Sequence, residues 1–62
     1  MRYNRVDITK TIASALRLAS RRNRNQYIYA TACGYLIDHA PPYFRQQYME
    51  ITPSGIVTTR ES

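Results

Sequence analysis

A single cysteine, Cys33, occurs among the 62 residues of this chain, so no disulfide can form within it. A domain of about 60 residues buries only about 60% of the surface that its unfolded chain exposes, and without disulfides or metals it is marginally stable. A lone thiol is also typical of a reducing compartment, which predicts a cytoplasmic location. We therefore expect one small domain, residues 1–62, that gains stability by forming a homodimer.

Several classes of protein are excluded by the composition. No run of 18 or more apolar residues occurs, so we expect no membrane-spanning helix. The apolar run from Ile12 to Ala19 is interrupted by Ser14 and Arg17, which is untypical of a secretory signal. Two isolated glycines cannot build a phosphate-binding loop, and one histidine with one cysteine cannot complete a zinc site within one chain. We expect no metal and no cofactor.

The side chains that could carry reactive chemistry are Cys33, Asp38 and His39. A thiol beside an imidazole can act as a nucleophile with its base. A free cysteine, however, is more typically a small buried hydrophobe, and this spacing defines no geometry between the thiol and the imidazole. We therefore predict that the protein is not an enzyme.

The first predicted element is an amphipathic helix of about four turns that begins near Asp7 and ends near Arg21. Asp7 or Thr9 can cap its first turn. At about 100° per residue, its apolar residues fall within an arc of roughly 160°. These residues are Ile8, Ile12, Ala15, Leu16, Leu18 and Ala19. We expect the homodimer contact to include part of this face, at Ile8, Ile12 and Leu16.

The segment from Asn25 to Cys33 has two interpretations. Its apolar residues share one helical face, which favours a second helix, closed by Gly34 in a left-handed conformation. The strand propensities of Tyr27, Ile28 and Tyr29 make a β-strand the competing prediction. Beyond Gly34 the chain is expected to be extended, with turns at Pro41-Pro42 and at Pro53-Ser54-Gly55. Residues 56–59 could form a last short strand, and a short helix beginning at Pro42 is the rival for the middle segment.

Two short motifs lie in the second half of the chain. Gly34-Tyr35-Leu36-Ile37 is followed by a loop with Arg45, and then by Tyr48-Met49-Glu50-Ile51-Thr52-Pro53-Ser54-Gly55. This arrangement resembles the wing of winged helix-turn-helix transcription regulators. The resemblance covers about a third of the chain and implies a hairpin over residues 35–52, with Arg45 near its tip in reach of DNA. The chain departs from the family in being too short for three helices before the wing, and in having no long helix after Gly55.

The predicted fold class is therefore α+β, with two helices followed by a β-hairpin in a winged-helix-like arrangement and a short C-terminal tail. The alternative is an all-α helical hairpin, which follows if the middle segment is helical. Both predictions place the whole chain in one domain.

The charged residues are mostly basic and are unevenly distributed along the chain. The net charge is +5, and no acidic residue occurs between Asp7 and Asp38. Arginine can contact phosphate and guanine with two donors at once, and Asn or Gln can do so with adenine. The sequence thus predicts a small regulator that binds nucleic acid, most readily duplex DNA. The predicted contact residues are Arg17, Arg21, Arg22, Arg24, Asn25, Gln26 and Arg45.

A second function of a different class fits the same composition. Six tyrosines and eight arginines could form the interface of an adaptor that binds an acidic protein partner, because Tyr and Arg are favoured anchors of protein interfaces. Salt-dependent binding to random DNA would distinguish the first function from the second.

Overall fold

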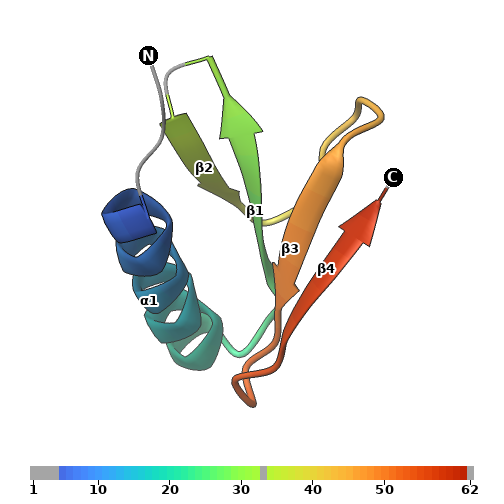
Figure 1. The fold of residues 1–62 in the computed structure, drawn as a ribbon. Helices are drawn as coiled ribbons and strands as arrows, with labels where there is room; N and C mark the ends of the chain where they lie inside the picture. Colours follow the sequence, from blue (N-terminus) through green and yellow to red (C-terminus); the bar gives the residue numbers. More distant parts are fainter. Residues whose placement is uncertain (1–4, 33, 62) are drawn as a thin grey trace.

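A computed structural model describes residues 5–32 and 34–61, and shows one helix and one four-stranded antiparallel sheet (Figure 1). Helix α1 spans Arg5–Arg22, and the strands follow it in the chain. They are β1 (Gln26–Thr31), β2 (Gly34–Asp38), β3 (Gln47–Ile51) and β4 (Val57–Glu61). The mixed α+β class agrees with the sequence prediction, but the predicted arrangement of elements is wrong.

The predicted second helix is a strand, β1. Along β1 the side chains of Gln26 and Ile28 are buried, whereas Tyr27 and Tyr29 are half-buried. This period of two is that of a strand with one face in the core, and aromatic and β-branched residues suit it. The all-α alternative is wrong for the same reason. Gly34 has a positive φ of 129°, as expected of a left-handed residue, but it begins β2 instead of closing a helix.

The predicted hairpin over residues 35–52 is wrong as well, because β2 and β3 do not pair with each other. The strand order is β2-β1-β3-β4, and both β2 and β3 pair antiparallel with β1. The two strands are therefore parallel to each other, and the segment 39–46 must cross β1 to connect them. That segment runs along the face of the sheet away from α1 (Figure 1). The short last strand expected near residues 56–59 is present as β4.

The first helix is confirmed, although it begins at Arg5, so that Asp7 and Thr9 lie inside it instead of capping it. Its apolar face packs on the sheet. Ala15 and Ala19 are fully buried with Ile28 and Ile51, and partly buried apolar side chains surround them. On the helix these are Ile8, Ile12 and Leu16. The centre of the contact is thus made by two alanines, which allow α1 to lie close to β1.

The helix ends at an asparagine. Asn23 has a φ of 53°, and the Arg24 N–H donates to the Ala19 carbonyl at 3.2 Å. This is the bond expected of a Schellman motif, in which a left-handed residue follows the last helical one. It turns the chain sharply into β1 and holds Arg24 beside the end of α1.

The connection from β3 to β4 is a tight hairpin. The Gly55 N–H donates to the Thr52 carbonyl at 2.9 Å, and the Thr52 N–H donates to the Ile56 carbonyl at 3.0 Å. Gly55 has a φ of 94°, as required of the left-handed residue in a three-residue hairpin loop. The turn predicted at Pro53-Ser54-Gly55 is therefore confirmed.

The helix covers part of one sheet face. It packs against β1, β2 and β3, and among the described residues it makes no contact with β4. Among the described residues, the opposite face carries segment 39–46 but no helix, and we call it the bare sheet face (Figure 1). The domain therefore presents three distinct surfaces: the outer side of α1, the bare sheet face, and the helix-side flank of β4.

Candidate nucleic-acid interface

The outer side of α1 is strongly basic. Lys10, Arg17 and Arg21 lie on the face away from the sheet, and all three are exposed. Arg22 ends the helix and Arg24 follows it, and both are also exposed. We call these five residues the basic surface. Its helical part, from Lys10 to Arg22, extends over about 18 Å, taking 12 steps at a rise of 1.5 Å per residue.

Among the side chains that the structure describes, no carboxylate pairs with these bases. Among the described residues, the ion pairs found are Asp38 with His39 and Glu50 with Arg60, and neither involves the basic surface. Both carboxylates belong to the bare sheet face, since Asp38 pairs with Tyr27 across β1 and β2, and Glu50 pairs with the same residue across β1 and β3. Asp38 and Glu50 therefore lie on the face of the sheet away from α1, apart from the basic surface.

Two predicted contact residues lie elsewhere. Gln26 is 1% exposed, on the helix side of β1, and its Nε2 has no hydrogen-bond partner. Asn25 is half-buried and its Nδ2 donates to Glu50 Oε2 at 3.3 Å. Buried or engaged amides are not placed to contact a base edge. Because β1 begins at Gln26, the alternation of the strand turns this side chain inward.

Arg45 is also separated from the basic surface. It is exposed on segment 39–46, which reaches the end of the sheet where β1 ends (Figure 1). Helix α1 ends at the opposite end of the sheet, near the start of β1. The structure thus brings together Arg17, Arg21, Arg22 and Arg24, and places Arg45 apart from them.

A network on the bare sheet face was not predicted from the sequence. Tyr27 and Tyr29 point to this face, where their hydroxyls donate to Glu50 Oε2 at 3.5 Å and to Asp38 Oδ2 at 2.9 Å. Glu50 also accepts from Arg60 Nε at 2.8 Å. The rings of Tyr27 and Tyr48 lie 5.9 Å apart at 59°. The spacing of Tyr27 and Tyr29 indicates a shared strand face, but their partners follow from pairings between distant segments.

The hydrogen bond between Tyr29 and Asp38 shifts the pKa of both side chains. The hydrogen bond to Asp38, followed by desolvation, raises the pKa of the Tyr29 hydroxyl. The same bond, followed by the His39 backbone N–H, lowers the pKa of Asp38. Because the pKa of Asp38 is lowered, the contact stabilises the fold until the pH falls through the pKa of Asp38 in the folded protein. Because the pKa of Tyr29 is raised, the contact stabilises the fold until the pH rises through the pKa of Tyr29 in the folded protein. The contact therefore contributes fully between these two transitions.

Replacing Tyr29 by phenylalanine should raise the pKa of Asp38 toward its ordinary value, because the largest cause of its depression is removed. The carboxyl carbon of Asp38, followed by NMR through an acid titration, measures this directly. Tyr27→Phe is the matched control, since the Tyr27 hydroxyl contacts Glu50 instead. An Asp38 titration that is the same in Tyr29→Phe and wild-type protein would contradict the assignment.

Segment 39–46 exposes two aromatic side chains. Tyr43 is fully exposed and Phe44 is 70% exposed, beside the exposed Arg45. Pro42, by contrast, is buried, so the segment is anchored on one side of these aromatic residues. Adjacent exposed aromatic side chains are typical of contact surfaces for other molecules.

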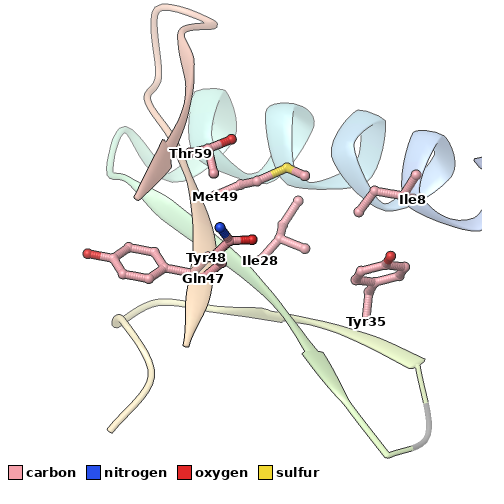
Figure 2. Close-up of a pocket in the computed structure, with 7 residues that line it drawn as sticks. All are labelled: Ile8, Ile28, Tyr35, Gln47, Tyr48, Met49 and Thr59. Atoms are coloured by element: carbon pink, nitrogen blue, oxygen red, sulfur yellow. The ribbon is translucent and has the colours of Figure 1, made fainter. Parts of the chain in front are cut away.

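One cavity of about 190 Å³ lies between α1 and the β3–β4 side of the sheet. Figure 2 shows Ile8, Ile28 and Met49 pointing into this space from the helix and the sheet. Tyr35, Gln47 and Thr59 also line it, and no charged side chain of the described residues does. The cavity is small beside the roughly 300–1,000 Å³ of ligand pockets, and its lining offers no acid or base.

The structure describes two residues of the reactive triple, Asp38 and His39. His39 Nδ1 lies 3.1 Å from Asp38 Oδ1 at the protein surface, and Cys33 lies outside the described residues. Within residues 5–32 and 34–61, no group of three or more His, Cys, Asp or Glu side chains could hold a metal ion.

The length and polarity of α1 also bear on membranes. In the part of the chain that the structure describes, no helix is both long enough and apolar enough to cross one.

The chain was compared with protein-family models, with curated proteins and with solved structures, and none of them matches it.

Proposed function

We propose that this protein is a cytoplasmic nucleic-acid-binding protein without enzymatic activity, and that it contacts duplex DNA through the outer side of α1. The observation that carries the proposal is the basic surface. Lys10, Arg17 and Arg21 are exposed on the outer face of α1, and Arg22 and Arg24 are exposed at its C-terminal end. No ion pair found among the described side chains involves them.

The physical basis is the release of counterions. Each phosphate neutralised by a basic side chain releases condensed cations, which favours binding in proportion to the number of contacts. An α-helix with its side chains is about 10–12 Å across, and the major groove of B-DNA is about 12 Å wide. The outer side of α1 is free of other elements, which suits contact with a groove or with the phosphates along it (Figure 1).

The structure narrows the proposed contact residues. Arg17, Arg21, Arg22 and Arg24 are retained, and Lys10 joins them because it lies on the same exposed side of α1. We omit Gln26 because it is buried, Asn25 because its amide donates to Glu50, and Arg45 because segment 39–46 lies on the face of the sheet away from α1. Because the retained contact residues are all cationic, we propose that binding depends mainly on phosphates and has little sequence preference.

The test is the salt dependence of binding to a short duplex, measured by fluorescence anisotropy. Log affinity should fall linearly with log salt, and Arg21→Gln should flatten the slope by about 0.9 because one phosphate contact is lost. The matched control is Arg45→Gln, which removes the same charge from an exposed position on the other side of the sheet and should leave the slope unchanged.

Two results would contradict the proposal. One is the absence of binding by wild-type protein at about 50 mM salt, where the electrostatic contribution is strong. The other is an equal loss of slope in Arg21→Gln and Arg45→Gln, which would show that net charge acts without a defined surface.

The adaptor function is the second candidate, and the exposed pair Tyr43 and Phe44 favours it. These aromatic side chains stand beside Arg45, in the combination that anchors many protein interfaces. An adaptor for an acidic protein would not require affinity for free DNA, so the salt titration decides between the two functions.

A further inference from the structure

Within the described residues, the outer edge of β4 is unpaired and unprotected. In the described part of the chain β4 is the last strand of the sheet, and α1 does not reach it. Val57 is 42% exposed and the adjacent Ile56 is 60% exposed. The cavity lined by Ile8, Met49 and Thr59 lies along the same flank (Figure 2). Soluble proteins usually shield such an edge, because its free N–H and C=O groups can pair with another strand.

The hydrogen bonding of the hairpin identifies which residues of β4 face outward. The Thr52 N–H donates to the Ile56 carbonyl, so this pair is hydrogen-bonded toward β3. Bonded and non-bonded pairs alternate along an antiparallel ladder. The pairs of Thr58 with Glu50 and of Arg60 with Tyr48 are therefore bonded to β3. The N–H and C=O groups that point to the free edge are those of Val57, Thr59 and Glu61.

We propose that two copies of this chain join through β4, in antiparallel register about a two-fold axis at Thr59. In this register Thr59 faces the partner's Thr59, and Val57 faces the partner's Glu61. All three outward residues of each copy then exchange hydrogen bonds, and the two sheets become one sheet of eight strands. Since paired residues share a face of a sheet, both copies carry α1 on the same side.

Other registers are less favourable. If the register shifted by one residue, the outward N–H and C=O groups of one copy would lie opposite residues of the other copy whose N–H and C=O groups are already hydrogen-bonded to β3. A two-fold axis at Arg60 would place two arginines directly opposite each other, which is destabilising. A two-fold axis at Thr58 would pair Val57 with the partner's Thr59. Glu61 would then lie opposite a residue outside the β4 strand of the other copy. The axis at Thr59 instead sets Thr58 opposite the partner's Arg60, with no like charges opposed.

A second copy is the occupant that the molecule itself favours. Among the described residues, the fully buried apolar core consists of Ala15, Ala19, Ile28 and Ile51, which is a small core. A two-fold pairing covers Val57 and the flank beside the cavity in both copies at once. The charge at the edge is also compatible, because Arg60 is already neutralised by Glu50 at 2.8 Å. The basic surfaces lie on α1, away from the paired strands.

The other edge of the sheet is a weaker site. Strand β2 is covered on its inner side by α1, whereas β4 is not. Pairing of β4 with the β2 of another copy would also leave a free edge on each molecule and would extend into a filament. Self-pairing of β4 closes at two copies. The homodimer contact expected from the sequence at Ile8, Ile12 and Leu16 is thereby moved to β4, with Ile8 beside it in the cavity wall.

Sedimentation equilibrium at about 100 µM should give a species of twice 7.2 kDa, because a useful dimer is populated at such concentrations. Thr59→Pro removes an outward N–H without removing a bond to β3, and proline is tolerated in edge strands. We expect it to weaken dimerisation about tenfold to a hundredfold, since one bond per copy is lost. A monomeric wild-type protein, or polymers that grow with concentration, would overturn the proposal.

Disulfide cross-linking tests the register even if the proline variant fails to fold. In a Cys33→Ser background, Thr59→Cys should oxidise to a covalent dimer, because Cα atoms of a hydrogen-bonded pair are about 5.5 Å apart and disulfides span about 4.4–6.8 Å. Thr58→Cys is the matched control, on the same strand but displaced from the axis, and should stay monomeric. Faster cross-linking of Thr58→Cys than of Thr59→Cys would overturn the register.

Discussion

Replacing Ile28 by alanine is expected to lower the free energy of unfolding by about 2–5 kcal/mol, the usual cost of truncating a buried isoleucine. Ile28 is 2% exposed and lies in the central strand, where it pairs with Ile37 on one side and Met49 on the other. A domain of this size has a total stability of roughly 3–9 kcal/mol, at about 0.05–0.15 kcal/mol per residue. The substitution should therefore remove a large part of the free energy of unfolding.

Urea unfolding followed by circular dichroism measures this loss. Leu36→Ala is the matched control, because Leu36 is an exposed aliphatic residue on the bare face of the same sheet. We expect it to change stability by less than about 1 kcal/mol, as surface substitutions do. Equal losses in the two variants would show that the core does not lie between α1 and β1.

Replacing Gln26 by methionine should have the opposite effect and stabilise the protein by about 1–3 kcal/mol. The Nε2 of Gln26 is buried without a hydrogen-bond partner, and an unpaired buried amide carries its full desolvation penalty. Methionine keeps the length of the side chain and removes the donor. The gain should appear as a higher urea midpoint at an unchanged slope.

Gln47→Met provides the control for this substitution, since Gln47 is exposed and gains nothing from losing its amide. Gln26→Met should also leave the DNA affinity of the protein unchanged, because its amide is inside the core. A loss of DNA affinity on this substitution would restore Gln26 as a contact residue, and a loss of stability would show that its amide is satisfied.

The sequence predicts α1 well, and the reason is that a helix is specified locally. The period of Ile8, Ile12, Ala15 and Ala19 is visible in one window of the chain, and the same pattern places the arginines outside. The turn at Pro53-Ser54-Gly55 is local too. These features required no knowledge of distant segments.

The sheet could not be predicted in the same way. For residues 26–31 the helical and strand patterns overlap, and the choice depends on β2 and β3, which supply partners on both sides. Segments 34–38 and 47–51 are separated by a turn, so local reasoning pairs them with each other. In the structure β1 lies between them. The burial of Gln26 and the hydrogen bond of Asn25 to Glu50 both follow from this pairing. Without knowledge of the pairing, the sequence analysis predicted that both amides lie on the surface.

The crossing of segment 39–46 over β1 has a consequence for folding. The chain consists of two locally closed units, α1 with the β1–β2 hairpin and the β3–β4 hairpin, and each can form from neighbouring residues. They meet in the sheet through the pairs Gln26–Ile51, Tyr27–Glu50 and Ile28–Met49. These contacts join residues more than 20 positions apart, and closing such loops is what limits folding rates. The pairing of β1 with β3 also brings Ile28 and Ile51 into the core. The rate-limiting step of folding and the completion of the core are therefore the same event.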